Sequence, residues 1–85
     1  MSKDSLTARA SEIISELAST RGVAKSFCPS EAARKLDAVD WRRHMPVVRA
    51  AGVALWREKR LAVLQKGVEV DPTEAKGPIR YSLPR

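Results

Sequence analysis

Residues 46–67 read PVVRAAGVALWREKRLAVLQKG, and within this stretch the spacing of the apolar residues changes from a helical to a strand period. In the first half, five apolar side chains cluster within about 100° of arc on a helical wheel. The clustered residues are Val47, Val48, Ala51, Ala54 and Leu55. In the second half, Leu61 and Val63 alternate with Ala62 and Leu64, which is typical of a strand. The stretch therefore predicts a helix over residues 46 to about 59, a strand, and a turn at Lys66-Gly67.

Two further helices are predicted upstream of this stretch. Over residues 5–20 the apolar residues recur at helical spacing, and Gly22 supplies a residue suited to a helix exit. Pro29 opens the second helix, since proline is favoured at the first helical position. A short helical turn over residues 41–45 follows, and Pro46 predicts a break there because proline inside a continuous helix costs about 3 kcal/mol.

Downstream, the pattern predicts a hairpin. Ile79, Tyr81 and Leu83 alternate with polar residues and predict a second strand. Residues 68–78 contain Asp71-Pro72 and Gly77-Pro78, and a proline lacks the N–H that a central strand needs, so this segment is predicted to be a long hairpin loop. Residues 25–28 are too short to assign from periodicity, and a minor strand that places Phe27 in the core is one interpretation of them.

The predicted fold class is α+β, specifically a winged helix-turn-helix with three main helices and a C-terminal β-hairpin. Eighty-five residues favour a single domain over residues 1–85, with a core of about residues 5–83. With 44% hydrophobic and 31% charged residues, the chain differs from disordered segments. A single cysteine excludes an internal disulfide, and the absence of a long apolar run predicts a cytoplasmic protein that does not enter membranes.

Five short motifs, in this order and spacing, resemble a bacterial family known as domain of unknown function 3253. They are Cys28-Pro29-Ser30-Glu31-Ala32-Ala33-Arg34, Trp41-Arg42, Met45-Pro46-Val47-Val48-Arg49-Ala50-Ala51, Gln65-Lys66-Gly67 and Gly77-Pro78-Ile79-Arg80. The resemblance spans about residues 10 to 83. It implies a fold similar to winged-helix proteins, and it implies no catalytic residues because the family has no settled activity.

The positive charge is concentrated in one part of the chain. Its net charge is +6, and residues 34–60 alone hold eight basic residues against three acidic ones. In a winged helix-turn-helix protein this segment includes the helix that enters the major groove, while the hairpin loop follows adjacent phosphates. We therefore expect a non-enzymatic module that binds double-stranded DNA mainly through phosphates. The candidate DNA-binding residues are Arg42, Arg43, Arg49, Arg57, Lys66 and Lys76.

A second interpretation stays open, namely a protein-interaction module or homodimer without a nucleic-acid role. Trp56 lies off the apolar face of the third helix, so it either covers the hairpin or marks an interface. An ion pair of Glu31 with Arg34 or with Arg49 would also occupy the basic groups. In addition, the link between the second and third helices is longer than the three or four residues of a DNA-reading helix-turn-helix.

No cofactor or metal site is predicted. Cys28 precedes a helix N-terminus, where a thiolate is stabilised, and His44 is the only histidine that could act as its base. Structural zinc sites use four ligands, more than this cysteine and histidine supply. A buried, unreactive Cys28 is the alternative, and the sequence predicts no enzyme.

Overall fold

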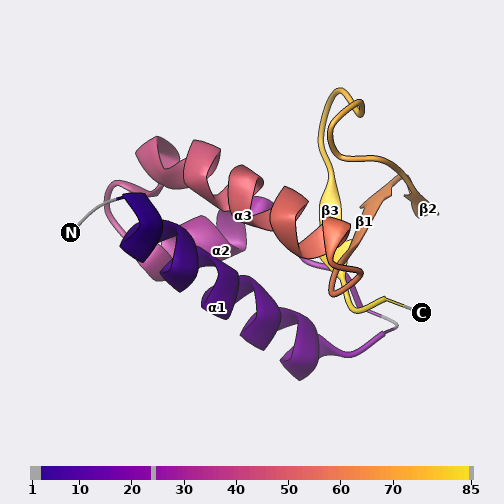
Figure 1. The fold of residues 1–85 in the computed structure, drawn as a ribbon, viewed down its shortest axis with the longest axis horizontal. Helices are drawn as coiled ribbons and strands as arrows, with labels where there is room; N and C mark the ends of the chain where they lie inside the picture. The colour runs from indigo at the N-terminus through magenta and orange to yellow at the C-terminus, as the bar shows by residue number, and fades with distance from the viewer. Residues whose placement is uncertain (1–2, 24, 85) are drawn as a thin grey trace.

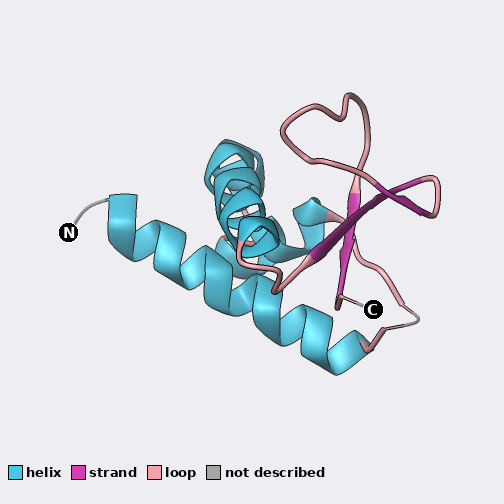
Figure 2. Cartoon of the chain, turned by 45° about the vertical axis from the view of Figure 1, so that its right-hand side comes forward, coloured by secondary structure: helices cyan, strands magenta, loops and turns pink. Residues whose placement is uncertain are grey.

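The computed structural model, which describes residues 3–23 and 25–84, contains three packed helices with a small antiparallel sheet at one end of them (Figures 1 and 2). The helices are α1 (Lys3–Arg21), α2 (Pro29–Leu36) and α3 (Met45–Arg57), and a 3-10 turn, η1 (Trp41–His44), leads directly into α3. This arrangement confirms the predicted α+β class.

Each helix ends near its predicted position for an identifiable local reason. Gly22 follows α1 with φ 81°, a left-handed conformation that glycine adopts without steric penalty. Pro46 lies in the first turn of α3, where its missing N–H removes no helical bond. The non-helical link between α2 and η1 is therefore only residues 37–40, and the rest of the long predicted connection is helical.

Three strands form the sheet: β1 (Ala62–Gln65), β2 (Val68–Glu69) and β3 (Arg80–Ser82), in the order β2-β1-β3. Lys66 and Gly67 have φ 54° and 82°, as in the two-residue turns that favour tight hairpins. The prediction of a loop over residues 68–78 was thus wrong at its start, because Val68 and Glu69 pair with β1 ahead of the first proline. The remaining loop links β2 to β3.

The core lies between the three helices and the inner face of the sheet. Phe27 forms an isolated bridge with Tyr81, as expected of a minor strand, and their rings pack edge to face at 5.8 Å. Both side chains are buried. From α3 the core receives Val48, Ala51, Gly52 and Leu55. Ala54, predicted to be on this face, is exposed, and Gly52 takes its place against Tyr81.

Candidate nucleic-acid interface

A groove separates α3 from the loop that links β2 to β3. Its volume is about 300 Å³. The residues that line it are Arg49, Val53, Pro72, Ala75, Lys76, Gly77, Ile79 and Tyr81. Arg49 is exposed on the middle turn of α3, and Lys76 is exposed on the loop. The fold therefore brings two of the predicted DNA-binding residues, distant in sequence, to the same groove.

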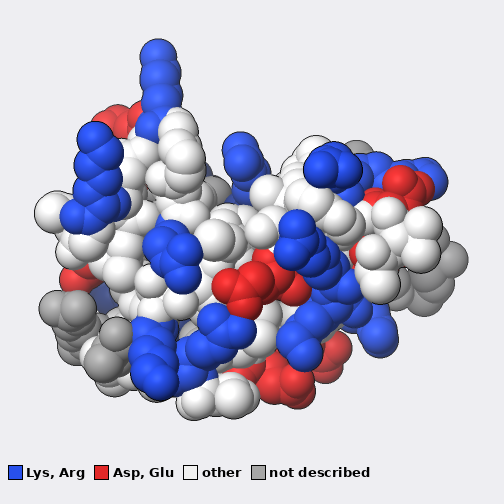
Figure 3. All heavy atoms as spheres, turned by 180° about the vertical axis from the view of Figure 1, so that it is seen from behind, with Lys and Arg blue, Asp and Glu red and all other residues white. Residues whose placement is uncertain are grey.

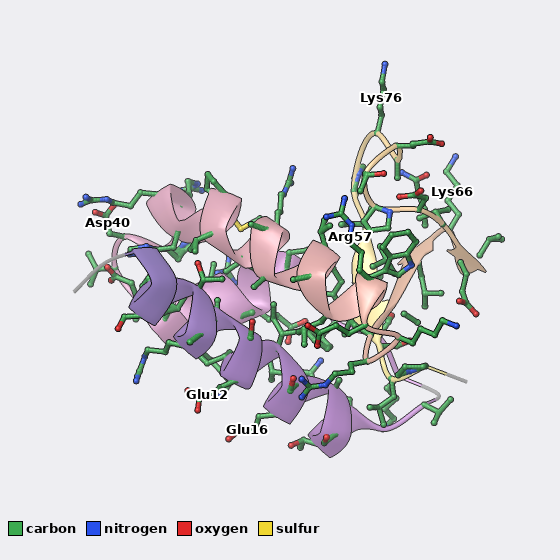
Figure 4. The ribbon with its side chains drawn as sticks, viewed as in Figure 1. Glu12, Glu16, Asp40, Arg57, Lys66 and Lys76 are labelled. Atoms are coloured by element: carbon green, nitrogen blue, oxygen red, sulfur yellow. The ribbon has the colours of Figure 1, made fainter. Side chains whose placement is uncertain are left out.

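Arg57 and Lys66 lie at the same end of the molecule. Figure 4 shows Arg57 at the end of α3, Lys66 on the turn between β1 and β2, and Lys76 projecting from the longer loop. Hydrogen bonds from the Thr73 hydroxyl and N–H lower the pKa of Asp71, and the charge of Arg57 lowers it further. Within the described residues, Arg49, Arg57, Lys66 and Lys76 form no salt bridge.

Arg42 and Arg43 lie elsewhere. They belong to η1, and Arg43 forms a salt bridge of 3.0 Å with Asp40, which Figure 4 shows at the end of the molecule far from Lys66 and Lys76. The 13 residues of α3, at about 1.5 Å each, separate the two ends by about 20 Å. Accordingly, Figure 3 shows lysine and arginine in several groups over one face, with acidic residues between them.

Trp41 contacts two of the basic residues near the η1 end of α3. The guanidinium carbons of Arg34 and Arg42 lie 4.6 and 4.7 Å from the centre of its indole ring. These distances fit cation–π contacts. Trp41 is also half-buried against the core, so it serves as an anchor and as a platform for the two arginines.

Glu31 has a partner that the sequence did not indicate. Its carboxylate accepts a hydrogen bond of 2.5 Å from Arg21, at the end of α1, and one of 3.2 Å from the N–H of Cys28. The bond from Arg21 is the main reason that the pKa of Glu31 is lowered. The alternative pairing of Glu31 with Arg34 or Arg49 is therefore wrong. The spacing of α1 and α2 in sequence gave no signal for this contact.

Trp56 is half-buried instead of fully exposed. It packs against the core and lines a shallow hollow with Leu61, Ala62 and Pro84. Its indole thus covers the start of β1. A role for Trp56 in an interface stays a prediction.

The proposed thiol chemistry lacks its base. The sulfur of Cys28 accepts a hydrogen bond of 3.0 Å from Arg80, whereas His44 lies 3.3 Å from Asp37. Cys28 and Asp37 cap opposite ends of α2, so His44 is not placed to deprotonate the thiol. Arg80 also donates to the hydroxyl and carbonyl of Ser26. The sequence held no signal for these contacts of Arg80 across the fold.

Across residues 3–23 and 25–84, no cluster of three or more His, Cys, Asp or Glu residues is arranged to hold a metal ion. In the same ranges, no helix combines the length and the apolar character needed to span a bilayer.

The sequence profile of a family described as protein of unknown function (DUF3253) matches residues 7–84. No curated protein matches the chain.

Proposed function

The chain belongs to the DUF3253 family, and from the geometry we propose that it is a winged-helix module that binds double-stranded DNA in the cytoplasm. The order of elements supports the winged-helix assignment, since α1, the Phe27 bridge, α2 and α3 precede a hairpin of β1 and β3 with a long loop. In this assignment α3 is the recognition helix and the loop of residues 70–79 is the wing.

One observation carries the proposal. Arg49 and Lys76 line a common groove between α3 and the wing loop, Arg57 and Lys66 lie at the same end of the molecule, and no described carboxylate forms a salt bridge with any of the four. Cations that are not held in a salt bridge can neutralise phosphates and release counterions, which is the main source of sequence-independent affinity for DNA. Arg42 and Arg43, at the far end of α3, make secondary contacts at most in this arrangement.

Fluorescence anisotropy with a mixed-sequence duplex at several salt concentrations tests the proposal. Four neutralised phosphates give a plot of log K against log salt with a slope of about −4. Each of Arg49→Gln, Arg57→Gln, Lys66→Gln and Lys76→Gln should make that slope shallower by about 1. No binding at low salt would reject the DNA function and leave the protein-interaction module as the better explanation.

Arg9→Gln is the matched control. Arg9 is exposed on α1 and does not line the groove, yet its substitution changes the net charge by the same amount. We expect it to leave the salt slope unchanged. A loss equal to that of the groove variants would show that net charge alone, instead of this surface, governs binding.

A further inference from the structure

A second and larger cavity opens beside the returning strand β3. Its volume is about 560 Å³. The residues that line it are Cys28, Leu64, Gln65, Lys66, Lys76, Pro78, Ile79 and Arg80. A separate hollow of about 290 Å³ shares the lining residues Cys28, Pro78 and Ile79 and is also lined by Met45.

The lining combines an apolar surface with positively charged side chains. Leu64, Pro78 and Ile79 supply the apolar part, and three of the other described lining residues are cations, with no carboxylate among them. Hydrogen bonds to Ser26 and Cys28 fix the position of the Arg80 guanidinium. Its charge also helps to lower the pKa of Glu31, yet the two side chains form no salt bridge within the described residues.

The neutral polar group of the cavity is already engaged. The amide nitrogen of Gln65 donates to the carbonyl oxygens of Lys76 at 2.5 Å and of Pro78 at 3.4 Å. These bonds fasten the wing loop to β1. They leave the cations, together with the apolar side chains, as the groups that can recognise a ligand. Figure 4 shows Lys66 and Lys76 on the two connections at the outer end of the sheet.

We propose that this cavity binds a small organic anion with an apolar body and a single carboxylate or phosphate group. Its volume lies within the range of about 300–1,000 Å³ that is usual for small-molecule sites, which combine apolar walls with a few polar groups. The apolar body of the ligand would pack on Leu64 and Ile79. Its anionic group would bind the lysine and arginine side chains of the lining. Inorganic phosphate alone leaves the apolar wall in water, and an organic cation is repelled.

Titration of the ¹⁵N-labelled full chain with decanoate, followed by amide chemical shifts, tests the proposal. We expect saturable shifts centred on Cys28, Gln65, Ile79 and Arg80, with a Kd on the order of 0.5 mM for a ligand of this size. Decylamine, which has the same chain and the opposite charge, should bind at least about tenfold more weakly. Inorganic phosphate should produce no saturable shifts. Equal responses to decanoate and decylamine, or shifts centred on α1, would overturn the proposal.

Two variants locate the binding. Leu64→Asp places a carboxylate on the apolar wall and should abolish the shifts, whereas Val68→Asp, on the neighbouring strand and outside the lining, should leave the Kd unchanged. If Leu64→Asp fails to fold, the double variant Lys66→Gln/Lys76→Gln decides. Loss of two exposed charges should weaken decanoate binding about fivefold, and an unchanged Kd would reject the site. No DNA is present in these titrations, so their outcome is independent of the proposed function.

Discussion

At Gly52, α3 packs directly against the ring of Tyr81 in β3. A Cβ atom built on Gly52 would lie 2.7 Å from the ring carbon of Tyr81 that carries the hydroxyl, well inside a normal van der Waals contact. Helix propensity alone would favour alanine over glycine by about 1 kcal/mol, whereas overpacking a core costs about 1–3 kcal/mol. Whether Gly52→Ala stabilises or destabilises the protein therefore depends on how rigidly the ring of Tyr81 is held.

We expect Gly52→Ala to destabilise the fold by about 2 kcal/mol, because the buried ring of Tyr81 has little room to move. Urea unfolding followed by circular dichroism measures the change. Tyr81→Phe removes the hydroxyl nearest to the new methyl group and should recover part of the loss in the double variant. Stabilisation by Gly52→Ala would contradict the close packing of α3 against β3.

Tyr81 also reports on Arg49, the central residue of the proposed interface. Burial raises the pKa of Tyr81 to about 12, and the positive charge of Arg49 opposes this rise. Since the folded state holds the phenol proton beyond the ordinary pKa of 10, stability should fall as pH rises from about 10 to 12.

The prediction is that Arg49→Gln raises the pKa of Tyr81 further, as measured by ultraviolet absorbance of this single tyrosine. Arg9→Gln, on α1, serves as the control and should leave the titration unchanged. An unaltered Tyr81 pKa in Arg49→Gln would mean that the guanidinium lies away from the groove.

At the scale of elements, α2 depends on Glu31 for its position. The carboxylate binds the N–H of Cys28 before the helix and Arg21 from α1, so it links the start of one helix to the end of another. The pKa of Glu31 is lowered in the folded state, chiefly by Arg21. Its contribution is therefore complete above the ordinary pKa of 4.5 and is lost as pH falls through the lower, folded value.

Glu31→Gln should accordingly reduce the free energy of unfolding by about 1 kcal/mol near neutral pH. The difference in the free energy of unfolding between Glu31→Gln and the parent protein should shrink as pH falls below 4.5. Chemical unfolding at a series of pH values checks both parts. Glu58→Gln, which removes an exposed carboxylate with a longer contact to Arg60, is the control and should have little effect. A difference that persists at low pH would show that the charge of Glu31 is not its source.

Local sequence patterns predicted the helices and strands better than they predicted the contacts between them. The change of period after residue 60 and the prolines at positions 29 and 46 were enough to predict α2, α3 and β1, since these signals act within one turn or strand. The short strand β2 was missed because two residues give too little alternation to be recognised. The pairing of Arg21 with Glu31 depends on how α1 packs against α2, which no local pattern encodes.

At the scale of the whole molecule, the candidate DNA-binding residues are divided, because Arg42 and Arg43 precede α3 whereas Arg57, Lys66 and Lys76 lie beyond its middle. Residues 34–60 predicted a concentration of charge, but linear counting could not show that Arg42 and Arg43 are displaced by the length of the helix from Arg57. Lys66 and Lys76, by contrast, are brought toward Arg57 by the hairpin (Figure 4). The sequence predicted which residues are basic and exposed, and the fold determined which of them share a surface.

Two double variants of equal net charge compare how much the two groups of arginines contribute to DNA binding. Arg49→Gln/Arg57→Gln and Arg42→Gln/Arg43→Gln each remove two positive charges, so an effect of net charge alone weakens DNA binding equally in both. If α3 and the wing form the interface, the first pair should make the salt slope shallower by about 2. The second pair should change it by less than 1, because Arg43 is paired with Asp40 and Arg42 lies against Trp41. The reverse ranking, measured by anisotropy over the same salt series, would move the interface to the η1 end of α3.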